Sequence, residues 1–344
     1  MAKELFPSKE RKKIWQRLGV VVILGLAIYL ILPQITVLTN SLQIVEAMLF
    51  WAVILAFIAQ VLSYFGSGYL LQKTLAIAQE GVSLVRSTLI VLGAASISIV
   101  AGGLVGSSAA IYHWTRGEGE DVEGATLASL LPSLFNDFIL VLFSIIGLTY
   151  LLAIRHLDKA QVIGFSIILA ILAMIFLIAV LAMRYRDRTV AIFDRIELLI
   201  GRLLRRKVDI SNVRKEVDNL FDAWEILWHS GWHLLALGAF LNVAFDMLTL
   251  YFMFVASGHI VGFGVLIAGY GLPILLGKIA FILPSGLGVV ETSMAALYTG
   301  LGVPGAVAVV VVLGYRLISF WIPSISGFPI AAYLQGRKVN RPGK

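Results

Sequence analysis

Long apolar runs separated by short polar segments dominate the chain from residue 14 to residue 334. Many of these runs approach or exceed the roughly 20 residues that an α-helix needs to cross a bilayer. The sequence lacks the polar and apolar alternation of membrane β-strands. The pattern predicts membrane-spanning helices over Ile14–Leu32, Ile44–Phe65, Ala125–Ala153, Ala160–Met183, Gly231–Ala256 and Ala306–Leu334.

Two further hydrophobic regions, Arg86–Tyr112 and Gly262–Leu301, are rich in glycine and serine, and each contains a break. The first break is AGGLVGSS at Ala101–Ser108, and the second is ILPSGLGVVE at Ile282–Glu291. Freed backbone groups and carboxylates need partners that lipid tails cannot supply, so such breaks indicate a protein-lined or water-filled site. Paired interruptions in corresponding positions of two halves are typical of transporter binding sites.

The distribution of basic residues favours a re-entrant path for both glycine-rich regions. With the N-terminal Lys and Arg cluster in the cytoplasm, full crossings throughout would place the basic segment Arg184–Lys215 outside. That segment returns to the cytoplasm if Arg86–Tyr112 enters from the cytoplasm and turns back. Gly262–Leu301 then dips in from the outside. We therefore predict an all-α polytopic membrane protein, a helical bundle with two inverted, re-entrant, glycine-containing broken-helix hairpins whose breaks meet near the midplane.

This arrangement predicts a multi-pass protein of the cell membrane with both termini in the cytoplasm. Amphipathic helices are expected in the connector, either packed beneath the bundle or recruiting anionic lipid through a basic face. The predicted parts are an N-terminal half at 1–183 with its re-entrant region at about 86–112, an amphipathic cytoplasmic connector at 184–230, a C-terminal half at 231–334 with its re-entrant region at about 262–301, and a basic cytoplasmic tail at 335–344.

Composition supports the membrane class and excludes several functions. Hydrophobic residues make up 59% of the chain and charged residues 14%, with a mean hydropathy of +0.93. The net charge of +7 fits membrane topology and attraction to anionic phospholipid, and it implies no nucleic-acid partner. The absence of cysteine excludes disulfides, thiolate nucleophiles and sulfur metal sites. No GxxxxGK[ST] motif for an ATP-driven pump occurs.

Polar residues within the apolar segments are the candidates for chemistry. Charges inside membrane spans are expensive, and they usually pair with one another or line a water cavity. We expect one of the carboxylates to neutralise Lys278 or Arg316, leaving at least one cation for a lipid phosphate. A purely structural ion-pair network is the alternative, and proton coupling through the carboxylates is a further hypothesis. The candidates are Asn136, Asp137, Asn242, Asp246, Lys278, Glu291 and Arg316.

The glycine motifs supply candidate backbone sites. A half-helix that begins near Leu287 would present free N–H groups to an anion, although Glu291, one turn in, could cap that end itself. His229 and His233 have the spacing of a metal pair, but no third ligand is in reach by sequence, so neither metal nor cofactor is predicted. The motif residues assigned to substrate binding are Gly102, Gly103, Gly106, Ser107, Ser108, Pro284, Gly286, Gly288 and Tyr315.

The second glycine motif carries a family resemblance. ILPSGLGVVETSMAAL, followed by YRLISFWIP at Tyr315–Pro323, resembles the C-terminal signature of the lysylphosphatidylglycerol synthase transmembrane-region family. IVAGGLVGSSAAIYHWTRGE and NDFILVLF are similar to the family's first glycine motif and the acidic helix after it. Three features depart from that pattern: Ala101 stands where many members have proline, Ser285 replaces a common glycine, and HWTRGEGED is poorer in arginine.

The resemblance implies movement of aminoacyl phospholipid or polyprenyl-linked lipid between leaflets. Because the sequence ends about ten residues after its last predicted span, we expect a stand-alone translocator served by a separate lipid-synthesising enzyme. The residues that match the motif positions of the family are Pro284, Gly286, Gly288, Glu291, Tyr315 and Arg316.

The predicted function is therefore a lipid flippase-like transporter, not an enzyme. Two other classes stay open. One is an intramembrane transferase that uses Glu291 with His229 or His233, and the other is a non-catalytic membrane subunit of a lipid glycosyltransferase.

Overall fold

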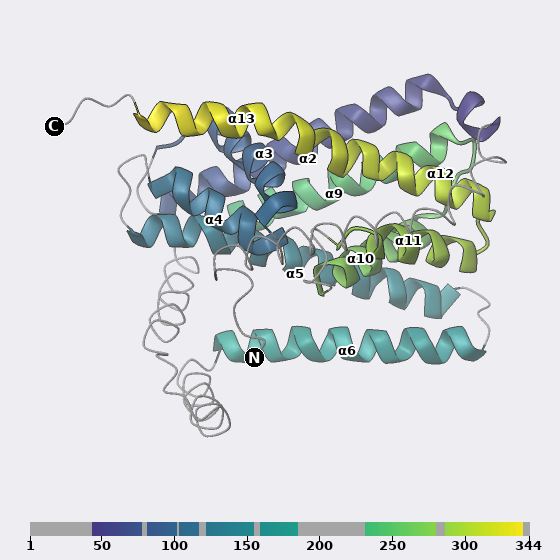
Figure 1. The fold of residues 1–344 in the computed structure, drawn as a ribbon. Coiled ribbons are helices and arrows are strands. Elements are labelled where there is room, and N and C mark those ends of the chain that lie inside the picture. The colour runs from purple at the N-terminus through teal and green to yellow at the C-terminus, as the bar shows by residue number, and fades with distance from the viewer. Residues whose placement is uncertain are drawn as a thin grey trace, which may run out of the picture.

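The computed structural model describes residues 43–77, 81–101, 103–116, 122–154, 159–184, 231–279 and 286–339. Every regular element within these ranges is a helix, which confirms the predicted all-α class (Figure 1). The helices are α2 (Phe50–Ile77), α3 (Leu84–Ala101), α4 (Gly103–Arg116), α5 (Val122–Ile154), α6 (Lys159–Arg184), α9 (Trp232–Ala256), α10 (Phe263–Ile279), α11 (Val289–Gly300), α12 (Gly305–Arg316), the π-helix η2 (Leu317–Trp321) and α13 (Ile322–Val339).

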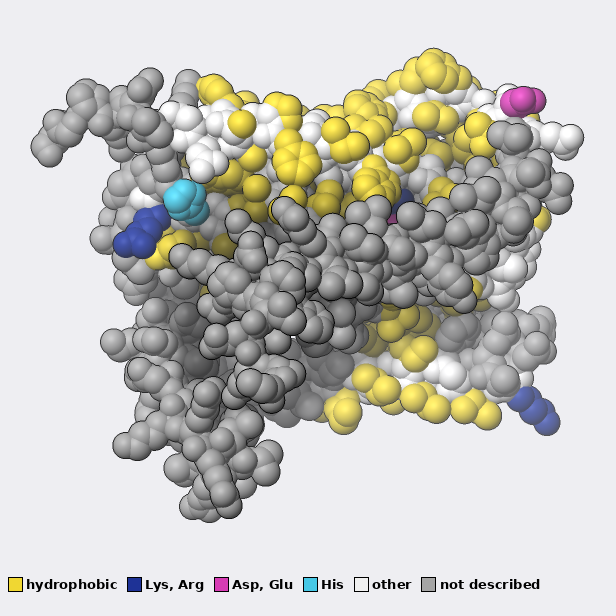
Figure 2. All heavy atoms as spheres, in the orientation of Figure 1, with side chains coloured by type: hydrophobic (Ala, Val, Ile, Leu, Met, Phe, Trp, Pro, Cys, Tyr) yellow, Lys and Arg dark blue, Asp and Glu magenta, His cyan; other side chains and the backbone are white. Residues whose placement is uncertain are grey.

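Four described helical stretches are long and apolar enough to cross a membrane, namely Phe50–Ile77, Ala125–Ala153, Trp232–Ala256 and Gly305–Gly336. The helix α6 also coincides with a predicted span. Hydrophobic side chains cover much of the described surface in Figure 2, whereas the charged and histidine side chains visible there lie mainly toward the two ends of the molecule. These features fit a multi-pass membrane protein.

The boundaries of one predicted span are wrong. The span expected at Ile44–Phe65 is instead α2, which begins at Phe50 and continues to Ile77, because small and polar residues beyond Phe65 are buried against neighbouring helices. The predicted last span, Ala306–Leu334, agrees closely with the apolar helical stretch Gly305–Gly336, although α13 itself continues to Val339, so the expected basic tail begins inside a helix. The predicted span Ile14–Leu32 and the amphipathic connector at 184–230 lie outside the described residues, apart from Arg184 at the end of α6.

The antiparallel pair α2 and α9 runs through the bundle. The amide of Leu49 donates to the carbonyl of Ala256 at 2.9 Å, and the Ser63 hydroxyl donates to the Asn242 side chain at 2.8 Å. Glycine permits the close crossing between them. A Cβ atom on Gly66 would lie 2.6 Å from the backbone nitrogen of Asn242.

Replacing Gly66 by leucine is expected to lower the free energy of unfolding by about 1–3 kcal/mol, because the backbones of α2 and α9 must separate. Gly164→Leu on α6 is the matched control, since no atom lies within 4 Å of a Cβ placed there. Thermal unfolding in detergent, followed by circular dichroism, compares the two variants. Equal midpoints would show that the crossing does not depend on glycine.

Both predicted breaks fall between helices. The first lies between α3 and α4, where Trp114 of α4 packs back against Gly93 of α3. The second lies between α10 and α11, where the Tyr298 hydroxyl donates to the Leu266 carbonyl at 3.0 Å and Val290 packs against Gly277. These contacts make each helix pair an antiparallel hairpin. Gly102, between α3 and α4 in the sequence, and residues 280–285, between α10 and α11, lie outside the described residues, so whether the breaks meet stays a prediction.

The two hairpins open toward opposite ends of the bundle (Figure 1). The α3–α4 hairpin follows the end of α2, and the α10–α11 hairpin follows the end of the antiparallel helix α9. Helix α10 then runs back along α5, with Gly264 against Tyr150 and Ala268 against Gly147. Its penultimate residue, Lys278, reaches Asp137 near the middle of α5. The second hairpin therefore reaches about halfway along the bundle.

Candidate functional site

Polar side chains from six helices gather at the level where α10 ends. Most of them lie near the middle of a long apolar helix, so they stand at a similar depth in the bundle. We call this set the central polar layer. It comprises Gln60, Ser63 and Tyr64 of α2, Asn136 and Asp137 of α5, Asn242 and Asp246 of α9, Tyr270 and Lys278 of α10, Glu291 at the start of α11, and Tyr315 and Arg316 at the end of α12.

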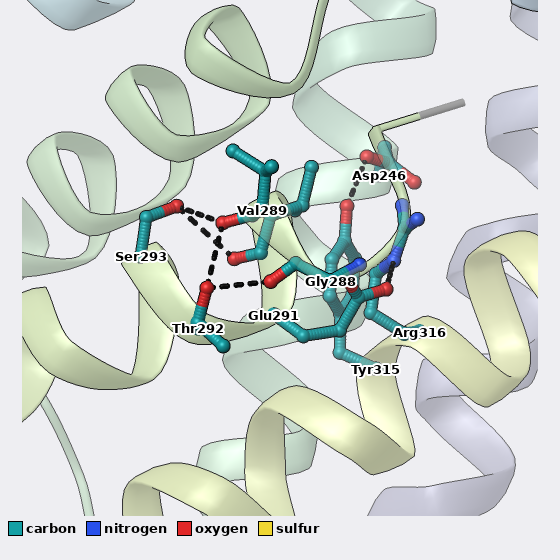
Figure 3. A network of polar contacts seen from close by, with 9 residues as sticks. Asp246, Gly288, Val289, Glu291, Thr292, Ser293, Tyr315 and Arg316 are labelled. Atoms are coloured by element: carbon teal, nitrogen blue, oxygen red, sulfur yellow. Dashed lines mark hydrogen bonds and ion pairs between the residues drawn. The ribbon is translucent and has the colours of Figure 1, made fainter. Parts of the chain in front are cut away.

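A buried ion pair joins the second hairpin to α12 (Figure 3). Arg316 Nε donates to Glu291 Oε1 at 2.6 Å, and the two side chains are only 10% and 9% exposed. The guanidinium also stacks on Phe320 of η2, with its carbon 4.5 Å from the ring centroid. Arg316 Nη2 is buried without a hydrogen-bond partner. The guanidinium therefore retains unused donor capacity at the π-helical segment, an element that is frequent at functional sites.

The local chain path at this ion pair depends on glycine. Gly286 and Gly288 have φ values of +66° and +83°, which residues other than glycine rarely adopt. A Cβ on Gly286 would also lie 2.6 Å from the Gly277 backbone. The Gly288 amide donates to Glu291 Oε2 at 2.7 Å, so Glu291 caps α11 as expected. One of the N–H groups that the sequence assigned to an anion is thus already occupied.

Asp246 is held by tyrosines instead of a cation. The hydroxyls of Tyr270 and Tyr315 both donate to its Oδ2 at 2.7 Å, and Gln60 of α2 lies against the same carboxyl. The two tyrosine rings are buried and meet edge to face. Asp246 itself is half-buried. Hydroxyl donors from two neighbouring helices therefore meet part of the hydrogen-bonding capacity of this carboxyl.

Lys278 pairs with Asp137, and each side chain is about one-third exposed at 34% and 35%. Both candidate cations are therefore paired, Lys278 with Asp137 and Arg316 with Glu291. The expectation that at least one of them stays without a carboxylate is wrong. In the described part of the layer, Asp246 is the carboxyl without a cation partner.

The partial exposure of the Asp137–Lys278 pair predicts a small contribution to stability. A water-filled cavity against the exposed third of each side chain would screen the pair, so a double-mutant cycle with Asp137→Asn and Lys278→Met is then expected to give a coupling free energy below about 1 kcal/mol. Chemical unfolding of the four proteins in detergent measures it. A coupling of several kcal/mol would show that the pair is desolvated and would undermine this assignment.

Amide and hydroxyl groups tie the layer together. Asn242 Nδ2 donates to Asn136 Oδ1 at 3.1 Å, which joins α9 to α5. The Ser63 hydroxyl donates to both the carbonyl and the side chain of Asn242, which adds α2. Polar contacts thus link the two halves of the chain in the middle of the bundle.

The other predicted site residues lie elsewhere. Gly103, Gly106, Ser107 and Ser108 occupy the start of α4, on the first hairpin. Gly102, Pro284 and His229 are outside the described residues, and His233 lies in the first turn of α9. Among the residues that the structure describes, no group of three or more His, Asp or Glu side chains could hold a metal ion.

Sequence reasoning missed the polar residues that complete the layer. Gln60, Ser63 and Tyr64 share one face of α2 at the spacing of successive helical turns, a signal that was available. Tyr270 offered a weaker signal, because a tyrosine in a glycine-rich apolar segment is equally expected at the membrane boundary.

The fold and this layer define a polytopic helical membrane protein with a charged centre. Residues 17–327 match the family described as the lysylphosphatidylglycerol synthase TM region, and the chain belongs to that family. This membership confirms the resemblance found in the glycine motifs.

Three relatives are UPF0104 membrane proteins of archaea. The one from Methanocaldococcus jannaschii is 26% identical over 211 residues, covering 60% of this chain and 59% of the relative. The one from Methanothermobacter thermautotrophicus is 29% identical over 164 residues, covering 46% and 49%. The one from Pyrococcus horikoshii is 37% identical over 89 residues, covering 24% of each. The chain thus spans about three-fifths or less of the length of these curated relatives.

Proposed function

We propose that the protein is a flippase-like transporter that moves a polar-headgroup lipid, either an aminoacyl phospholipid or a polyprenyl-linked lipid, between the two leaflets of the cell membrane. The observation that carries this proposal is the central polar layer. Charged and hydroxyl groups stand halfway along apolar helices, where a lipid headgroup must cross and where uncompensated polar groups are costly. The second hairpin contributes Tyr270, Lys278 and Glu291 to this level, and the first hairpin opens toward the opposite end of the bundle.

Helix contacts support an inverted repeat. Helix α3 of the first hairpin packs on α13, and α10 of the second hairpin packs on α5. In each case the first helix of one hairpin packs on the helical stretch that comes after the other hairpin, which is α5 in the first half and α12–η2–α13 in the second. Within each half, α4 packs on α5 and α11 packs on α12. The same contacts therefore occur in both halves, as expected if a pseudo-two-fold axis relates them. Rocking of inverted halves is a known basis of alternating access.

The proposed mechanism assigns different environments to the two parts of the lipid. The headgroup crosses through the central polar layer while the acyl chains stay in the bilayer. Each hairpin dips into the membrane from one face and returns, and the two open alternately. Anionic phospholipid around the bundle, a separate lipid-synthesising enzyme as partner and cytoplasmic termini belong to the same proposal.

Dithionite quenching of a headgroup-compatible fluorescent lipid in proteoliposomes tests the function. We expect the purified protein to expose inner-leaflet probe faster than protein-free vesicles do, with the lipid chemically unchanged by mass spectrometry. A modified lipid would assign the protein to the transferases. Neither movement nor modification, across aminoacyl and polyprenyl lipids, would contradict the transporter and favour a non-catalytic subunit.

A further inference from the structure

The charges of the central polar layer do not cancel among its described members. Glu291 pairs with Arg316 and Asp137 with Lys278, which leaves the carboxylate of Asp246 without a cation in direct contact, although the Arg316 charge acts on it from the neighbouring pair. A net negative charge in the middle of an apolar bundle is costly unless a counter-charge is supplied. The two tyrosine hydroxyls reduce that cost but bring no positive charge. One bound positive charge would therefore neutralise the described members of the layer.

The groups around Asp246 are oxygen ligands. Tyr270 and Tyr315 both donate to Oδ2, so Oδ1 lies outside these two bonds, and each hydroxyl oxygen keeps lone pairs. Gln60 is only 5% exposed and lies against this carboxyl, yet its Oε1 has no hydrogen-bond partner. A buried amide oxygen without a donor costs about 1–3 kcal/mol, so it is normally matched by a ligand or water. The unmatched acceptor and the uncompensated carboxylate occur at the same place.

We infer that Asp246, Gln60, Tyr270 and Tyr315 form a binding site for a small monovalent cation, with Na⁺ as the natural occupant. Oxygen ligands suit hard cations. One carboxylate among neutral oxygens matches a single positive charge. A divalent ion is disfavoured because the described residues place no cluster of further carboxylates here and because Arg316 acts on the same carboxyl.

A protonated amine from a lipid headgroup shares this chemistry, but the geometry favours the inorganic ion. The acceptor that lacks a donor belongs to Gln60, whose side chain is almost completely buried on α2. A bare ion can reach that oxygen without bringing a hydrocarbon chain into the packed helices. Occupancy of this site is independent of the proposed function. Only its use as the coupling ion for lipid movement rests on that proposal.

Binding can be measured on the full chain in detergent without any lipid transport. We expect ²²Na⁺ to bind saturably in a scintillation-proximity assay. NaCl should also raise the thermal midpoint, whereas choline chloride at equal ionic strength should not. Asp246→Asn is expected to weaken Na⁺ binding at least tenfold. Gln60→Met, which keeps the side-chain length without the amide oxygen, should also weaken Na⁺ binding. It provides the test if Asp246→Asn does not fold.

Glu46→Gln is the matched control, because it removes a carboxylate from an exposed position before α2, outside the central polar layer, and it should leave Na⁺ affinity within twofold. Three results would overturn the inference. One is the absence of saturable Na⁺ binding at any pH tested, which would leave a proton as the counter-charge. Another is Na⁺ binding that is unchanged in both Asp246→Asn and Gln60→Met. The third is competition for the site by lysine ethyl ester without any binding of Na⁺, which would assign it to an ammonium headgroup.

Discussion

Replacing Arg316 by methionine is expected to lower the free energy of unfolding by about 3–5 kcal/mol, because Glu291 would remain buried with an uncompensated charge. Glu291 would keep the Gly288 amide but lose its only described cation. Arg116→Met is the matched control, since Arg116 is exposed at the end of α4. Chemical unfolding in detergent, followed by circular dichroism, measures both variants.

A second variant separates the charge from the packing. Glu291→Gln combined with Arg316→Met removes both charges and retains an acceptor for the Gly288 amide, so it should recover most of the lost stability. If the double variant is as unstable as Arg316→Met alone, the loss comes from packing on Phe320 and the buried-charge explanation is wrong.

Replacing Asp246 by asparagine is expected to slow lipid translocation at least about tenfold, equivalent to raising the barrier by about 1.4 kcal/mol. The variant removes the uncompensated charge of the central polar layer. Its stability should change little, because an amide oxygen can still accept hydrogen bonds from the two tyrosine hydroxyls. Dithionite quenching in proteoliposomes gives the rate, and thermal unfolding verifies the fold.

Glu46→Gln is the control for this variant, since it removes a carboxylate from an exposed position before α2. Its translocation rate should equal that of the original protein. If Asp246→Asn also translocates at the original rate, the uncompensated carboxylate has no part in transport. The proposed role of the central polar layer would then have to rest on the paired residues alone.

The helices themselves could be predicted from the sequence because long apolar runs allow no other stable structure in a membrane. The breaks were also visible, since Gly102 and the Pro284–Gly288 segment interrupt those runs. The end of α2 was not visible. Residues after Phe65 look too polar for a span, and only the packing of Gly66 and Gly68 on α9 and α3 explains why they are helical and buried.

The pairing of charges could not be predicted for a related reason. Three carboxylates and two cations were candidates. Which of them pair depends on the axial register of α10 along α5 and on which face α11 presents to α12. Glycine contacts such as Gly147 on Ala268 set the first of these registers. That register brings Lys278 to Asp137 and leaves Asp246 to Tyr270 and Tyr315. Sequence separation carries no information about such contacts between distant helices.

In the proposed transporter, the two hairpins enter the membrane from opposite faces and return to the face from which they started. The protein has no cysteine, so single cysteines can be labelled without background. Suitable positions are Ile260→Cys and Gly305→Cys at the open end of the α10–α11 hairpin, and Gly81→Cys and Arg116→Cys at the open end of the α3–α4 hairpin, all exposed.

Labelling with a membrane-impermeant maleimide in vesicles of uniform orientation measures which face each cysteine occupies. We expect the cysteines at 260 and 305 to react from one face and those at 81 and 116 to react from the other. Reaction of positions 260 and 305 from different faces would show that the α10–α11 segment crosses the membrane and is not a re-entrant hairpin.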